Sequence, residues 1–301
     1  MNVIVPRPVT LISSNVPNGP HPPWSSAVTY SVSDRVYDDS TTPHRIYESL
    51  LNSNNGKTPP EHPDSWVEVG STTRWAMLDT MVSSTTTNLD TISVTLNASK
   101  VDRIALFGLV GESVRIVARN GATVIEDTTL SLRLDDQSVS WSDYFFSDIE
   151  YRTRLIRTIP GYYANLEIDI TITAATGTEA ACGHCILGRS QFIGLTEWGA
   201  KVGIDDYSRK TINDWGETYL QQRAYADTLS IDLWIDTQTS GAEVDRLQRI
   251  LSSLRATPCV WDANNDTERQ ALIVFGFFRD FSLVVPYATI SHCSLEIEGM
   301  I

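Results

Sequence analysis

The chain has 301 residues, of which 42% are hydrophobic and 20% are charged, and its formal net charge is −14. This composition is typical of a folded protein, and the length suggests two or three domains. The acidic balance argues against a surface for nucleic acids or anionic membranes, and no apolar run approaches the roughly 20 residues of a membrane helix.

Residues 1–23 are predicted to be an extended arm that leads into the first strand. Proline blocks regular structure, and the segment contains Pro6, Pro8, Pro17, Pro20, Pro22 and Pro23. The first residues also lack the basic stretch and the sustained apolar core of a signal peptide.

Residues 24–70 are predicted to form a small β module framed by Trp24 and Trp66. Tyrosines lie between the two tryptophans, and Asp, Asn, Gly and Pro residues break the segment into short strands. A segment this short cannot close a large core, so most of its aromatic rings are expected to pack inside it.

The tryptophan frame, the strand D-R-V-Y at 34–37 and the Gly/Pro turn before Trp66 resemble the small chitin-binding modules of the family 5/12 type. That resemblance implies exposed aromatic rings that stack on sugar faces. The sequence departs from the family pattern after the second strand, where Leu50 and Leu51 replace the expected platform. If a glycan is bound, the binding is expected to be weak, and the candidate residues are Trp24, Asp34, Tyr37, His44 and Tyr47.

Residues 71–195 are predicted to form an antiparallel β-sandwich of jelly-roll type. Residues 91–96 and 165–173 alternate apolar and polar side chains, and residues 103–109 form a more buried run. Asn120-Gly121 predicts a hairpin turn in which both residues have positive φ. In Cys182-Gly183-His184-Cys185, two buried structural thiols are favoured over a metal site, and a metal site over a redox pair.

Residues 196–301 are predicted to form an α+β domain with one helix. Strands are expected at 228–236, 271–278, 281–285 and 289–297. Ser240 and Glu243 have the spacing of a capping box for a helix over 241–255, which Pro258 ends. The apolar residues on one face of this helix are Val244, Leu247, Ile250, Leu251 and Leu254.

The same domain is predicted to make assembly contacts, because it has more aromatic residues than a unit of roughly 100 residues must bury. These residues are Trp198, Trp215, Tyr219, Tyr225, Phe277, Phe278 and Phe281. An acidic chain repels its own copies unless the contacts are apolar or join opposite charges. The basic residues expected to contact a neighbour are Arg209, Lys210, Arg246, Arg249 and Arg255.

The motifs that would indicate catalysis, a metal or a cofactor all fail on their spacing. Gly56-Lys57-Thr58 lacks the preceding glycine of a phosphate loop, and prolines follow it. The segment 262–273 lacks the glycine and the glutamate of a calcium loop and is interpreted as a polar turn. We therefore expect no enzyme activity, no metal and no cofactor.

Three further segments, 74–79, 193–210 and 293–301, resemble structural proteins of tailed bacteriophages and prophages, in which a chitin-binding-like module accompanies a β-sandwich and an α+β domain. The resembling segments are spread over most of the chain. They imply a virion component of the tail, baseplate or collar, made in the host cytoplasm, which assembles in several copies with itself and with other tail proteins. The alternative is a phage adhesin whose small module binds a receptor or cell-surface glycan; neither function implies nucleic-acid binding or membrane insertion.

Overall fold

The computed structural model describes residues 1–81, 84–134, 150–236, 242–264, 269–284 and 290–300. The predicted fold class is confirmed: the chain is mainly β with antiparallel sheets and an α+β part that contains the helix. The chain divides into two compact units. Unit 1 consists of residues 1–7, 101–103 and 187–301, and unit 2 consists of residues 8–100 and 104–186.

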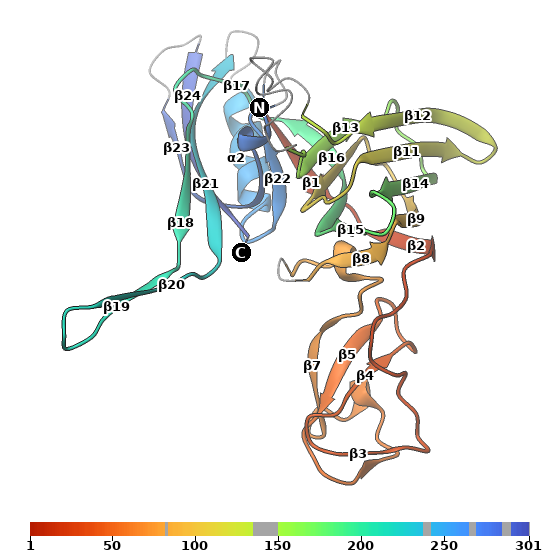
Figure 1. Cartoon of the computed structure of the whole chain (residues 1–301). Helices are drawn as coiled ribbons and strands as arrows, with labels where there is room; N and C mark the ends of the chain where they lie inside the picture. Colours follow the sequence, from red (N-terminus) through yellow and green to blue (C-terminus); the bar gives the residue numbers. More distant parts are fainter. Residues whose placement is uncertain (82–83, 135–149, 237–241, 265–268, 285–289, 301) are drawn as a thin grey trace, which may run out of the picture. The chain divides into compact units, whose positions relative to one another are not determined.

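The small module lies within unit 2 and contains two short antiparallel sheets (Figure 1). One sheet has the order β4-β5-β7, and the other pairs β3 with β6. The strands are β3 (Thr29–Tyr30), β4 (Arg35–Asp38), β5 (Arg45–Ser49), β6 (Asn54–Asn55) and β7 (Trp66–Ser71), and the 3₁₀ helix η1 (Pro59–Glu61) precedes β7.

The core of the small module consists mainly of aromatic rings, as the sequence predicts. Trp66 is 2% exposed, and it is buried together with Tyr30, Val36 and Tyr47, while the half-buried Trp24 packs against this cluster. The rings of Tyr30 and Trp66 meet edge to face with centroids 5.2 Å apart. Trp66 Nε1 also donates a hydrogen bond of 2.9 Å to the Lys57 carbonyl oxygen, which satisfies the buried indole N–H.

The remainder of unit 2 contains a five-stranded antiparallel sheet with the order β12-β11-β14-β9-β2. Side chains in β9 and β14 alternate between buried and less buried positions, because successive residues of a strand point to opposite faces. The alternation predicted for 91–96 and 165–173 is therefore confirmed. The strands are β2 (Val9–Ser14), β9 (Thr91–Ala98), β11 (Ser113–Asn120), β12 (Thr123–Ser131) and β14 (Leu166–Thr173).

Further strands of the chain lie outside this sheet. β8 (Thr86–Leu89) pairs with β15 (Glu179–Cys182), and β10 (Arg103–Phe107) pairs with β13 (Arg154–Thr158). The run predicted to be buried at 103–109 contains β10, in which only Arg103 is not buried. The two 3₁₀ helices outside the small module are η2 (Ala76–Leu78) and η4 (Gln270–Leu272).

The hairpin predicted at Asn120-Gly121 exists, but the prediction of its turn geometry is wrong. Asn120 pairs with Thr123, so the two loop residues are Gly121 and Ala122. Gly121 has a φ of +59°, and Asn120 is not among the residues with positive φ. Positive φ at the first loop position alone is the pattern of a type II′ turn, in which glycine is needed only there.

Unit 1 is built on an antiparallel sheet in which β1 pairs with both β16 and β22. From β1 the order continues as β1-β22-β23-β24-β21-β17, and β18 pairs with the first half of β21. The segment 1–23, expected to be an arm, thus contributes β1 to this sheet. The strands are β1 (Asn2–Pro6), β16 (His184–Phe192), β17 (Leu195–Thr196), β18 (Lys201–Asp206), β21 (Tyr225–Asp236), β22 (Cys259–Asp262), β23 (Ile273–Val284) and β24 (Ile290–Gly299).

The helix α2 (Ala242–Ser253) packs its apolar face on this sheet, which curls around it (Figure 1). Leu247, Leu251 and Leu254 are buried, and Val244 and Ile250 are half-buried, so the predicted apolar face of the helix is confirmed. Ser240 of the predicted capping box lies outside the described residues. The buried partners of the helix include Leu229, Ile231, Leu233, Cys259, Trp261, Cys293 and Leu295.

The two strands predicted at 271–278 and 281–285 are one continuous strand, β23, with a bulge. The register of β23 on β24 shifts between Phe278 and Asp280, so one extra residue is inserted there. Residues three apart in a regular strand point to opposite faces. Because of the bulge, Phe278 and Phe281 both pack against the core, with ring centroids 5.8 Å apart.

We expect Trp66→Ala to destabilise the small module by about 3–5 kcal/mol, because it removes the largest ring of a very small core. The matched change Val67→Ala affects an exposed neighbour on the same strand and should stay within about 0.5 kcal/mol. Hydrogen–deuterium exchange of the amides in β4, β5 and β7 measures both. Equal protection in the two variants would contradict the packing of Trp66.

Candidate functional site

The aromatic residues predicted to bind glycan do not form a common stacking surface. Tyr47 is 9% exposed and belongs to the core of the small module. Trp24 is half-buried against the same core, and its backbone N–H donates to the carbonyl oxygen of the half-buried Tyr37 at 2.8 Å. A ring buried in a core cannot stack on a sugar, so Tyr47 is excluded from any such platform.

The two polar candidates of the small module have structural partners. The Asp34 carboxylate accepts a hydrogen bond of 2.6 Å from the Ser31 backbone N–H, which closes the turn before β4. His44 Nδ1 lies 3.0 Å from Asn18 Oδ1, and the imidazole lies 5.5 Å from the ring of Trp75. Burial lowers the pKa of His44, so the imidazole is neutral at pH 7.

All four cysteines are buried free thiols, in agreement with the favoured interpretation of Cys182 and Cys185. Burial raises the pKa of Cys182 to about 12 and that of Cys293 to about 11. Burial also raises the pKa of Cys259 to about 12 and that of Cys185 well above its usual value. Among the described residues, no group of three or more His, Cys, Asp and Glu side chains is placed to hold a metal ion.

The basic residues predicted to contact a neighbour lie on two parts of unit 1. Arg246 and Arg249 are exposed on α2, and Arg255 is exposed just beyond it. Arg246 forms an ion pair of 2.8 Å with Glu243 one turn away, so part of its charge is neutralised locally. Arg209 and Lys210 are exposed on β19 (Arg209–Ile212).

β19 pairs with β20 (Thr218–Gln221) in a hairpin that extends from the ends of β18 and β21 (Figure 1). Every residue of β19 and β20 is exposed, so this hairpin has no core of its own. Trp215 at its tip is 89% exposed, and Leu220 is 77% exposed. Large apolar side chains on an open ribbon are typical of a surface that a partner covers.

The turn at the tip of the hairpin, residues 213–217, is fixed by the side chain of Asn213. Asn213 Oδ1 accepts hydrogen bonds from the backbone N–H groups of Trp215 at 3.1 Å and Glu217 at 2.8 Å. Asn213 Nδ2 donates to Glu217 Oε2 at 2.8 Å, and the Asn213 carbonyl oxygen accepts from Gly216 N at 3.0 Å. The backbone on both sides of Trp215 is therefore held in one conformation.

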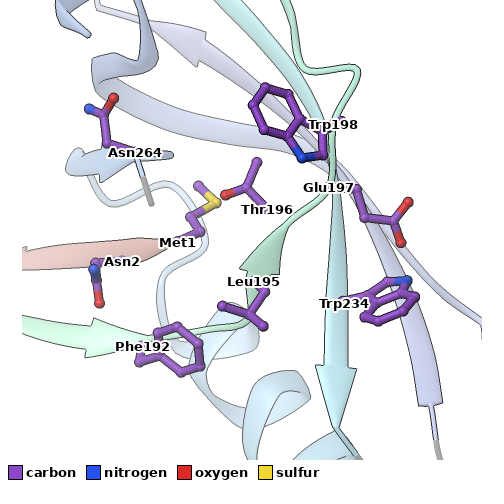
Figure 2. Close-up of a pocket in the computed structure, with 9 residues that line it drawn as sticks. All are labelled: Met1, Asn2, Phe192, Leu195, Thr196, Glu197, Trp198, Trp234 and Asn264. Atoms are coloured by element: carbon purple, nitrogen blue, oxygen red, sulfur yellow. The ribbon is translucent and has the colours of Figure 1, made fainter. Parts of the chain in front are cut away.

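A pocket of about 640 Å³ lies toward the opposite end of β21 from this hairpin (Figure 2). We call it the tryptophan pocket, because Trp198, which is 96% exposed, and the partly exposed Trp234 both line it. In the view of Figure 2, Glu197 lies between these two indole rings, and Phe192 lies beside Leu195. The full lining is Met1, Asn2, Phe192, Leu195, Thr196, Glu197, Trp198, Trp234 and Asn264.

Strand pairing and hydrogen bonds hold the wall of the tryptophan pocket in place. Gly194 allows the chain to approach β21 closely, because a Cβ atom there would lie 2.9 Å from the Trp234 carbonyl oxygen. Thr196 Oγ1 donates to the Ala263 carbonyl oxygen at 3.0 Å. Glu197 Oε1 lies 2.8 Å from His292 Nδ1, and the His292 ring meets the Trp234 ring edge on at 6.2 Å.

The chemistry of the tryptophan pocket suits an aromatic side chain that brings positive charge with it. The pocket offers apolar rings and one carboxylate, Glu197, among its lining residues. Aromatic rings favour offset or edge-to-face partners, and the carboxylate favours a cation nearby. A second hollow of about 630 Å³ shares Thr196, Glu197 and Trp198 with it, so the segment 196–198 forms a ridge between two depressions.

Sequence reasoning found two residues of this region and missed the pocket. Trp198 and Trp215 are among the surplus aromatics, and the prediction that they are exposed is confirmed, whereas Phe278 and Phe281 pack against the core. The pocket combines residues near 1, 195, 234 and 264, which only strand pairing brings together. No local sequence pattern carries that information.

No protein-family model matches the chain, and no curated protein shows significant similarity to it. In the part of the chain that the structure describes, no helix is long and apolar enough to cross a membrane.

We expect titration with chitin oligomers to show binding weaker than micromolar. Tyr47 is buried, and Leu50 and Leu51 are exposed where an aromatic platform would be needed. Isothermal titration of the whole chain, with Tyr37→Ala as the matched variant, measures this. Micromolar or tighter binding that Tyr37→Ala abolishes would contradict the expectation.

We expect the four native thiols to react very slowly with a maleimide at pH 8. A thiol with a pKa of about 12 is ionised in about one molecule in 10,000 at that pH, and burial also blocks access. The chain unfolded in guanidinium is the control and should show all four thiols at the ordinary rate. A thiol that reacts as fast in the native chain would show that its residue is accessible.

Proposed function

We propose that this chain is a structural component of a tailed bacteriophage virion, in the tail, baseplate or collar, and that it assembles in several copies through unit 1. The observation that carries the proposal is the β19–β20 hairpin, whose strands are exposed throughout and whose tip presents Trp215. Such a ribbon has too little buried surface to stabilise itself, and a neighbouring protein in an assembly would cover it.

The phage assignment is supported by the sequence resemblance of the small module and of the segments 74–79, 193–210 and 293–301. The third of these segments includes much of β24, and the second begins at the tryptophan pocket and ends in β19. The resembling segments therefore coincide with the region in which the exposed aromatic residues lie.

Charge also supports assembly through the hairpin. Residues 207–224 contain three basic side chains, Arg209, Lys210 and Arg223, and two acidic ones, Asp214 and Glu217, whereas the whole chain has a net charge of −14. A locally basic segment on an acidic protein is attracted to the acidic surface of a neighbouring copy or of another tail protein. The partners that we propose are copies of this chain and other tail proteins.

We expect Lys210→Glu to reduce incorporation of the chain into phage particles by about tenfold or more, since loss of about 1.4 kcal/mol per contact has that effect. Lys100→Glu in unit 2 makes the same charge change at another exposed lysine and should leave incorporation unchanged. Quantitative mass spectrometry of purified particles measures both. Circular dichroism of the free chains should show the same fold for both variants.

Electron microscopy of particles that carry a tagged chain provides the direct test of location. The tag is expected on the tail, baseplate or collar. Its absence from purified particles would refute the proposed function.

A further inference from the structure

We propose that the hairpin tip of one copy, residues 213–217, docks in the tryptophan pocket of a second copy. The inference deepens the proposed function, on which it rests, by naming the partner of this surface. Its elements are the two most exposed tryptophans among the described residues, Trp215 on the tip and Trp198 on the pocket.

The tip cannot reach the tryptophan pocket of its own chain, because the two lie toward opposite ends of β21. Trp234 lines the pocket, and Tyr225 begins the strand where the hairpin joins it. Nine residues separate these positions, and a strand rises about 3.3 Å per residue, so they lie roughly 30 Å apart. The hairpin then continues away from that end of β21, as Figure 1 shows. An occupant of the pocket that uses this tip must come from another copy.

The size and the rings of the tryptophan pocket fit an inserted indole. A volume of about 640 Å³ accommodates one large side chain together with its turn. Trp198, Trp234 and Phe192 offer ring faces and edges, which aromatic partners prefer to flat stacking. Insertion would cover Trp215 and Trp198 together, and these are the side chains whose exposure to water is least favourable.

The charges of the two surfaces are complementary. Glu197 lines the pocket, and Asp232 lies on the exposed face of β21 two residues from Trp234. Arg209 and Lys210 lie on β19, close behind the tip. Acidic copies that otherwise repel each other would therefore meet with opposite charges at this contact, which favours the second copy as the occupant.

The tip is prepared for docking by the turn that holds Trp215. Asn213 bonds the backbone N–H groups of Trp215 and Glu217, so little backbone freedom remains to be lost on binding. Tip and pocket are different surfaces of one chain, so the contact is heterologous. Repeated contacts of this type produce a ring when the rotation closes, which is the arrangement that a tail component around an axis requires.

Cysteine cross-linking of the whole chain tests the contact, because all four native cysteines are buried. One preparation carries Asp214→Cys on the tip, and a second, distinguishable by mass, carries Asn2→Cys on the pocket wall. The two are mixed and treated with a short bis-maleimide, and the mixed dimer is quantified. The matched control replaces Asn2→Cys with Lys100→Cys, at an exposed position in unit 2.

We expect at least about tenfold more tip–pocket dimer than tip–control dimer, and a loss of about tenfold when Trp215→Ser is added to the tip chain. Tyr225→Ser, an exposed aromatic at the base of the hairpin, should leave the yield unchanged. Equal yields for pocket and control positions, or a yield that Trp215→Ser does not change, would overturn the inference.

The two proposals fail in different ways. If microscopy places the chain on the particle while the cross-link is absent, the docking of tip in pocket is wrong and the proposed function stands. If the cross-link forms but the chain is absent from particles, self-association stands and the phage assignment is wrong.

Discussion

The alternating burial of β21 beneath α2 is the constraint on which the arrangement of unit 1 depends. Four alternate side chains of the strand, Leu229, Ile231, Leu233 and Ile235, are buried in the core that also contains Leu251 and Trp261. A slip of one residue would move this whole set to the solvent face, so the register is strongly fixed. The same period places Asp232 and Trp234 outside. A single well-anchored strand thus sets the pocket wall near one end and supports the hairpin at the other.

Local patterns in the sequence predict much of this fold, because the physics that forms the elements is local. Alternation in β9 and β14 and the apolar face of α2 are each visible in a few consecutive residues. The bulge in β23 is not visible, since its cause is the need to place Phe278 and Phe281 on one face of a sheet that pairs with distant β24. The turn after Asn120 differs for a related reason: the pairing register decides which residue opens the loop.

The candidate site divides in the same way between local and long-range information. A surplus of aromatic residues is a matter of composition, and it identifies Trp198 and Trp215 correctly as exposed. Which of them gather around a hollow depends on strand order, and β1 reaches the pocket only because it pairs with β16 and β22. The list of basic residues also mixed two environments. Arg246 has an acidic partner on its own helix, whereas Arg209 and Lys210 lie on a ribbon that reaches outward.

The small module shows why a family-like sequence pattern can outlast the activity for which the family is known. Its core has Tyr30, Val36, Tyr47 and Trp66 and little else, so few positions could change without unfolding it. These same residues form most of the tryptophan-framed pattern. The pattern is therefore a signature of what a very small β fold needs in order to exist. Ligand recognition is written in the remaining surface positions, which are free to diverge, and in this chain leucines stand there.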